Sequence, residues 1–131
     1  MLRASCLCKR VRFEIHGALG RSSHCHCSMC RKAHGAAFGS YAAVKAENCQ
    51  VVAGAELILR YKSSPGVERS FCSRCGSTLQ FISAKQPGVV DIALGIFDDD
   101  PGIRDVVSDF LGRHGYKVEM AADAYDAARG A

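Results

Sequence analysis

The cysteines constrain this chain of 131 residues more than any other feature, because seven of the eight fall into three short clusters. The clusters have the spacings C-x-C, C-x-C-x-x-C and C-x-x-C, and Cys49 stands alone between the second and the third. Such clustering is typical of metal ligands and far exceeds what buried, unligated cysteines show, whereas Cys49 is expected to be a buried small residue. We therefore expect two zinc ions on the clustered cysteines, which are Cys6 and Cys8, Cys25, Cys27 and Cys30, and Cys72 and Cys75.

The first and third clusters together can form one closed zinc site. A C-x-x-C pair followed by glycine is a common zinc knuckle, and Gly76 follows Cys75 directly. In an extended C-x-C segment, both side chains project to the same side of the backbone and can share an ion. We expect Cys6, Cys8, Cys72 and Cys75 to bind a structural zinc that joins the amino-terminal strand to a distant hairpin.

The middle cluster offers three thiolates within six residues. Three protein ligands with an open fourth position are the pattern of a catalytic zinc, which predicts this role for Cys25, Cys27 and Cys30. Alternatively, His24 or His26 could supply a fourth ligand and make this a second closed, structural site.

Composition and charge limit the compartment and the partners. Hydrophobic residues make up 48% of the chain and charged residues 23%, as in an ordinary globular domain. No apolar run approaches the ~18 residues of a membrane span, and no apolar segment precedes Cys6, so we expect a cytoplasmic protein without a membrane partner. The formal charge is +4, but seven zinc-bound thiolates and two zinc ions would leave only +1, which argues against a nucleic-acid partner. A short basic stretch at Lys9, Arg10 and Arg12 keeps a nucleic-acid-binding zinc ribbon as a rival hypothesis.

The strand pattern predicts a mainly β fold of short antiparallel strands. Residues 11–16 alternate apolar and polar side chains with period two, and residues 72–75 lie at the tip of a predicted hairpin. After the break at residues 98–102 the pattern turns α/β-like, with helices expected at 105–112 and 121–129 and a strand at 116–120. The strands expected before the break cover residues 11–16, 38–44, 50–53, 57–62, 67–71, 78–82 and 89–94.

Several motifs in a fixed order give the chain a family resemblance. It resembles the glutathione-dependent formaldehyde-activating enzymes, a family that includes centromere protein V. The resemblance implies a β-tent type zinc fold over residues 1–103, with Cys6, Cys8, Cys72 and Cys75 on a structural zinc and Cys25, Cys27 and Cys30 on a catalytic one. The motifs that carry it are residues 5–8 (Ser-Cys-Leu-Cys), 11–13 (Val-Arg-Phe), 23–35 (Ser-His-Cys-His-Cys-Ser-Met-Cys-Arg-Lys-Ala-His-Gly), 70–77 (Ser-Phe-Cys-Ser-Arg-Cys-Gly-Ser) and 98–102 (Asp-Asp-Asp-Pro-Gly).

The carboxyl end departs from that family. Its members continue with an aromatic-rich stretch that includes a Lys-Ala-Pro-Trp type motif, whereas this chain has no tryptophan. Residues 104–131 are therefore expected to form a divergent, α/β-like segment packed on the same domain. An incomplete sheet edge could be completed by a second copy, which makes a homodimer an expected option.

The resemblance implies a zinc-dependent carbon–sulfur lyase that acts on small thiol adducts. The reaction it suggests joins glutathione and formaldehyde to S-hydroxymethylglutathione, so a small thiol and an aldehyde are the expected partners. Arg31 or Lys32 could hold a carboxylate of the thiol substrate, and His34 or His26 could move the proton. The alternative is a non-catalytic two-zinc binding or scaffold module. Two arginines near the C-x-x-C pair of Cys72 and Cys75 are expected to be surface charges, namely Arg69 and Arg74.

Overall fold

The computed structural model describes residues 1–99 and 103. The chain divides into two compact units, Met1–Asp98 and Asp99–Ala131, and every element named below belongs to the first. The helices predicted at 105–112 and 121–129 and the strand predicted at 116–120 lie outside the described residues, and the domain boundary at residue 103 stays a prediction.

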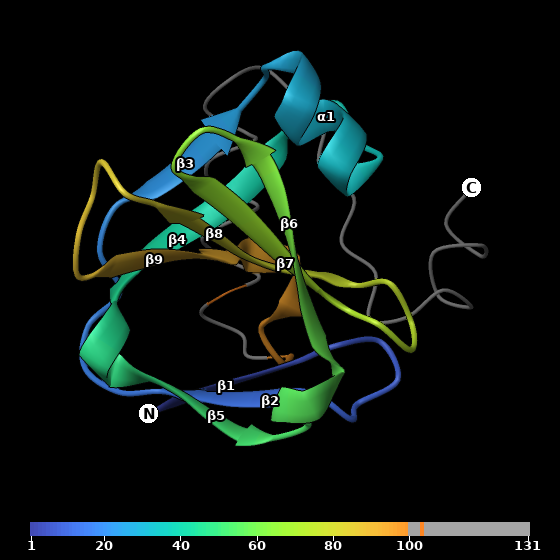
Figure 1. Ribbon diagram of the computed structural model, residues 1–131. Coiled ribbons are helices and arrows are strands. Elements are labelled where there is room, and N and C mark those ends of the chain that lie inside the picture. Colours follow the sequence, from blue (N-terminus) through green and yellow to red (C-terminus); the bar gives the residue numbers. More distant parts are fainter. Residues whose placement is uncertain (100–102, 104–131) are drawn as a thin grey trace, which may run out of the picture. The chain divides into compact units, whose positions relative to one another are not determined.

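The first unit contains two antiparallel sheets, so the predicted mainly β fold is confirmed (Figure 1). The small sheet has the strand order β1-β2-β5 and the large sheet the order β3-β4-β9-β8-β7-β6. The strands are β1 (Leu2–Ser5), β2 (Arg12–Ile15), β3 (Ser22–Cys25), β4 (Gly39–Lys45), β5 (Cys49–Ala53), β6 (Ile58–Ser64), β7 (Val67–Cys72), β8 (Thr78–Ser83) and β9 (Val89–Ala93). Short 3-10 turns cover Ala46–Asn48, Ala55–Leu57 and Leu94–Ile96.

One short α-helix, α1 (Ser28–His34), follows the β3 strand at one end of the large sheet (Figure 1). It begins at Cys27, whose side chain accepts a hydrogen bond from the backbone N–H of Cys30, and it ends at Gly35 in the left-handed conformation. No helix among the described residues is long and apolar enough to cross a membrane.

The hydrophobic core draws on both sheets, which face each other in Figure 1. Phe13 and Ile15 alternate with the half-buried Glu14 in β2 and are fully buried, as the period-two pattern predicts. Ile92 of β9 and Leu79 of β8 contribute fully buried side chains from the large sheet. Burying each such side chain contributes about 1.5–3 kcal/mol, so this core is a main source of stability.

The register of the large sheet decides which side chains meet on each of its faces. Arg69 of β7 lies directly opposite Phe81 of β8, and the next pair along these strands is Ser70 and Gln80. Because successive side chains alternate between the faces, Arg69 and Phe81 share one face and Ser70 and Gln80 the other. The second face is turned to the small sheet, since Gln80 Nε2 donates to the Cys49 Sγ at 3.7 Å. Arg69 therefore lies on the outer face, together with helix α1.

Candidate metal centres

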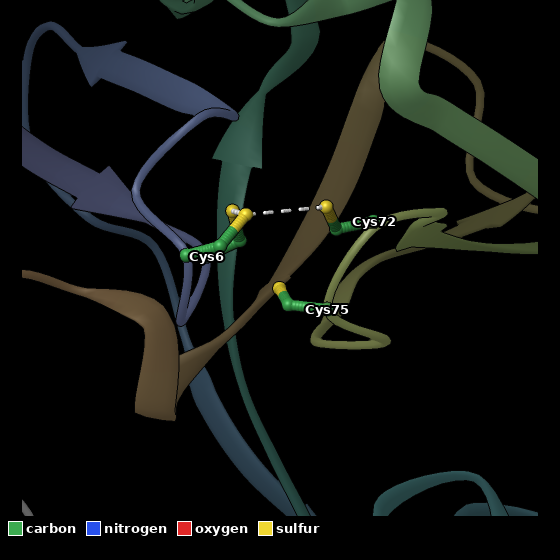
Figure 2. Close-up of side chains that lie close together, drawn as sticks. Cys6, Cys72 and Cys75 are labelled. Atoms are coloured by element: carbon green, nitrogen blue, oxygen red, sulfur yellow. Dashed lines mark hydrogen bonds between the residues drawn. The ribbon is translucent and has the colours of Figure 1, made fainter.

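Four cysteines that are distant in sequence form the first cluster. The Sγ atoms of Cys6, Cys8, Cys72 and Cys75 all lie within 4.8 Å of one another. Figure 2 shows Cys6 approaching Cys72 and Cys75 from a different chain segment. Cys6 and Cys8 follow β1 of the small sheet, whereas Cys72 ends β7 of the large sheet and Cys75 lies in the turn after it. The cluster therefore links the two sheets.

The spacing of these sulfurs fits a tetrahedral thiolate site. The Sγ atoms of Cys6 and Cys8 are 3.5 Å apart, and those of Cys8 and Cys72 are 3.9 Å apart. A tetrahedron with zinc–sulfur bonds of about 2.3 Å has edges of roughly 3.8 Å. These two distances are close to that value, so the four residues can hold one metal ion.

Ser77 holds the two halves of this cluster together. Its Oγ accepts a hydrogen bond from the backbone N–H of Leu7 at 2.9 Å and lies 3.3 Å from the Sγ of Cys75. The Ser77 hydroxyl therefore has its proton available for Cys75. Hydrogen bonds, first that of the Ser77 hydroxyl and then those of backbone groups and of Cys72, lower the pKa of the Cys75 thiol to about 5. The turn itself is closed by Gly76, which has a φ of 77° and donates its backbone N–H to the Cys72 carbonyl.

The second cluster lies where β3 leads into α1. The Sγ atoms of Cys25, Cys27 and Cys30 lie within 4.8 Å of one another, with Cys30 buried and Cys27 exposed. The backbone N–H of Cys30 and then the thiols of Cys25 and Cys30 lower the pKa of the Cys27 thiol to about 7. The three sulfurs can hold one metal ion, and the exposed Cys27 leaves the cluster accessible from solvent.

Neither neighbouring histidine joins this cluster. No histidine nitrogen or carboxylate oxygen within the described part of the chain shares the 4.8 Å group with the three sulfurs. His24 Nδ1 lies 2.8 Å from the Ser40 Oγ, on the strand next to β3. The ring of His26 lies 5.1 Å from that of Phe38. The structure thus gives no support to a fourth histidine ligand.

A buried arginine faces the second cluster, and the sequence analysis placed it wrongly. Arg69 was expected on the surface, but it is only 8% exposed because its position in β7 turns it toward the outer face that α1 covers. Its Nη1 and Nη2 atoms lie 3.5 Å and 3.6 Å from the Sγ of Cys30. The alternation of side chains along residues 67–71 was the signal for a buried position, although not for this partner.

Tyr41 and His34 extend the contacts of Cys30. The Tyr41 hydroxyl donates to the Cys30 Sγ at 3.6 Å, accepts from Arg69 Nη1 at 3.2 Å and lies 2.8 Å from His34 Nε2. Because the hydroxyl has one proton, His34 must donate from Nε2 when Tyr41 donates to Cys30. Burial and then the charge of Arg69 lower the pKa of His34, so this imidazole is neutral at pH 7. Sequence analysis selected His34 but missed Tyr41.

The remaining predicted residues lie outside these contacts. Arg31 and Lys32 are exposed in the last turn of α1, where cations complement the helix dipole. Cys49 belongs to neither cluster, as expected, and burial raises the pKa of its thiol. A pocket of about 450 Å³ adjoins Arg69 on the outer face, and Ala33 of α1 and Tyr61 of β6 also line it.

Within the described residues, two sheets, one short helix and two cysteine clusters that can hold metal define a small, mainly β protein with two candidate metal sites. A model of the family described as glutathione-dependent formaldehyde-activating enzyme matches residues 1–113. The chain belongs to this family.

Three individual proteins are similar to this chain, and the first of them carries the family's name. A Halomonas elongata protein, provisionally named a glutathione-dependent formaldehyde-activating enzyme, is 36% identical over 109 residues, which are 76% of this chain and 68% of that protein. A Schizosaccharomyces pombe protein, described as an uncharacterized lyase, is 32% identical over 77 residues, 59% of this chain and 54% of that one. The crystal structure of a Rhodobacter sphaeroides protein is similar in fold, with a TM-score of 0.64, 22% identity and coverage of 76% of this chain and 92% of that chain.

Proposed function

We propose that this protein is a zinc-dependent carbon–sulfur lyase that forms and cleaves adducts of small thiols with aldehydes. Glutathione and formaldehyde, which give S-hydroxymethylglutathione, are the first substrates to test. The observation that carries the proposal is the three-cysteine cluster, which is open to solvent at Cys27 and has no fourth ligand among the described residues. The family description and the lyase name of a relative support the same reaction class.

The two clusters would have different roles, one structural and one catalytic. Cys6 and Cys72 are buried, and a zinc ion on the four-cysteine cluster would be structural because it has four protein ligands and joins two sheets. The donor set of Cys25, Cys27 and Cys30 suits the same metal, since thiolates prefer soft or borderline cations. Zinc bound there would supply a Lewis acid that lowers the pKa of an incoming thiol.

The residues around the second cluster could handle the proton that this reaction moves. When a thiol adds to an aldehyde, the new carbon–sulfur bond forms as the sulfur attacks the carbonyl carbon, and the thiol proton ends on the carbonyl oxygen. His34 is partly exposed and neutral at pH 7, so it could accept that proton and return it. Tyr41 would hold the imidazole through the 2.8 Å contact to Nε2.

Recognition of the thiol substrate would use the basic end of α1. Arg31 and Lys32 are exposed one and two positions after Cys30, and either could bind a carboxylate of glutathione. A cytoplasmic location and a homodimer also stay predictions. The edge strands of the large sheet are β3 and β6, and either could pair with a second copy.

The test is an exchange measurement, because the uncatalysed addition of thiols to formaldehyde is comparatively easy. Zinc-loaded protein is added to glutathione and formaldehyde at equilibrium, and NMR exchange spectroscopy measures the interconversion with S-hydroxymethylglutathione. The wild type and Cys49→Ala should accelerate exchange, whereas Cys27→Ser should not. If the zinc-loaded wild type does not accelerate the interconversion of formaldehyde and its adduct with glutathione, cysteine or 2-mercaptoethanol, the binding-module alternative replaces this proposal.

A further inference from the structure

We propose that Arg69 is a positioning residue that serves as counter-ion to the Cys30 thiolate and thereby tunes the three-cysteine metal site. The inference rests on the proposed function in one respect, namely that Cys25, Cys27 and Cys30 hold a metal. It adds Arg69 of strand β7, which is 39 positions away from Cys30 in the sequence. The charge of Arg69 would set how strongly the site binds and polarises that metal.

The first argument is the burial of a permanent charge. A guanidinium stays protonated in proteins, and an uncompensated buried charge costs several kcal/mol. Arg69 is 8% exposed, yet neither of the ion pairs formed within the described residues includes it; these join Arg60 to Glu68 and His16 to Glu14. A compensating negative charge must therefore come from another kind of group.

The contacts of Arg69 identify that group. Two of its nitrogens point at the Cys30 Sγ, at 3.5 Å and 3.6 Å. The other polar partners are the hydroxyls of Ser63, at 3.0 Å from Nε, and Tyr41, at 3.2 Å from Nη1. Hydroxyls offer no negative charge at neutral pH. The Cys30 sulfur is the remaining partner that can be anionic.

Several contacts hold the guanidinium in this position. All three nitrogens have partners, and the carbon atom between them lies 5.0 Å from the centre of the Phe81 ring, within the range of a cation–π contact. A side chain fixed in this way cannot turn toward a substrate without breaking several contacts. Arg69 is therefore suited to orient Cys30 and not to bind the substrate itself.

The charge has a direct consequence for a metal site. Three thiolates and one Zn²⁺ carry a net charge of −1, and the adjacent guanidinium neutralises this charge. Hydrogen bonds to a ligating sulfur withdraw electron density from it, so Cys30 would be a weaker donor and the metal a stronger electrophile. Among the three cysteines, this effect falls on Cys30, because both guanidinium contacts end on its sulfur.

Arg69→Met and Arg69→Lys test the inference, with Arg60→Met as the matched control. Arg60 is an exposed arginine on the adjacent strand β6 that pairs with Glu68. Each variant is loaded with Co²⁺, and the spectrum of the same variant carrying Cys27→Ala is subtracted, which leaves the three-cysteine site. The sulfur-to-cobalt charge-transfer band reports the donor strength of the thiolates, and competition with a chromophoric chelator gives the zinc affinity.

The expected result for Arg69→Met is a shift of the band to longer wavelength, because the Cys30 sulfur becomes a stronger donor. Because Cys30 also loses the contacts that hold it in place, we expect a loss of about 10–100-fold in zinc affinity at one site only. Arg69→Lys keeps the charge but not the two-nitrogen contact, so it should shift the band less, and Arg60→Met should not shift it. An unchanged band and affinity in Arg69→Met would overturn the inference, as would equal loss of zinc at both sites. If Arg69→Met does not fold, an unshifted band in Arg69→Lys overturns it.

This outcome is separable from that of the proposed function. A shifted band in a protein that accelerates no thiol–aldehyde exchange would support the role of Arg69 and refute the lyase activity. Exchange activity that depends on Cys27, together with an unshifted band, would support the lyase activity and refute the role of Arg69.

Discussion

The Sγ atoms of Cys8 and Cys72 lie 3.9 Å apart, although 64 positions separate the two residues in the sequence. Cys8 lies in the loop between β1 and β2 of the small sheet, and Cys72 ends β7 of the large sheet. A metal ion between them would close a long loop and fix the two sheets to each other. The stability of the fold should therefore depend on this cluster more than on the other.

Replacing Cys72 by alanine should remove this link. Cys72 is fully buried, and its loss leaves the closed site with three of its four ligands, so zinc there is bound more weakly and stabilises the fold less. We expect the free energy of unfolding, measured with urea, to fall by about 3 kcal/mol or more. The matched control is Cys49→Ala, which removes a cysteine outside both clusters and should cost about 1 kcal/mol or less. Equal losses in the two variants would show that the four-cysteine cluster is not structural.

Removing the hydroxyl of Tyr41 should destabilise the protein. Tyr41→Phe leaves the half-buried His34 Nε2 without its hydroxyl partner, and the buried Arg69 Nη1 keeps only its contact with the Cys30 sulfur. A buried donor that loses its partner costs about 1–3 kcal/mol, and we expect a loss of this size in urea unfolding. Tyr61→Phe provides the comparison, because Tyr61 is 65% exposed and its loss should change stability by at most ~0.5 kcal/mol. A Tyr41→Phe protein as stable as the wild type would contradict the hydrogen-bond network.

The protonation of His34 should make the fold less stable in acid. Burial, and then the charge of Arg69, lower the pKa of His34 from 6.5, so the native state binds this proton less readily than the unfolded state. The free energy of unfolding should therefore fall as the pH drops below about 6.5 and level off once the pH is below the pKa of the native state.

His34→Gln should weaken this pH dependence. The measurement compares the free energy of unfolding at pH 7 and pH 5 in the wild type and the variant, since acid-induced metal loss is common to both. His16→Gln changes an exposed imidazole, so the difference between its free energies of unfolding at pH 7 and pH 5 should equal that of the wild type. A titration of the His34 ring by NMR with a midpoint above 6.5 would show that the environment favours the charged form, contrary to this account.

The cysteine clusters could be predicted from the sequence because their spacing is local. C-x-C and C-x-x-C bring two sulfurs together within a single turn or strand, whatever the rest of the fold does. The period-two pattern of β2 and the hairpin of β7 and β8 were predictable for the same reason, and the structure confirms both.

The surroundings of Cys30 could not be predicted in this way. Arg69 reaches Cys30 because the register of β7 and β8 places it on the outer face, and that register depends on the whole sheet. The four-residue strands β1 and β3 lack a strong pattern of their own and depend on pairing with their neighbours. The helix α1 is seven residues long, too short to show an apolar stripe, and its start depends on the Cys27 cap.

Counting the zinc bound per chain tests the central claim most directly. Protein purified under reducing conditions should contain two zinc ions in the wild type and in Cys49→Ala, and one in a folded Cys27→Ala variant. Circular dichroism confirms that each variant is folded. One zinc ion or none in the well-folded wild type, or two in Cys27→Ala, would contradict the account of a closed structural site beside a separate functional one.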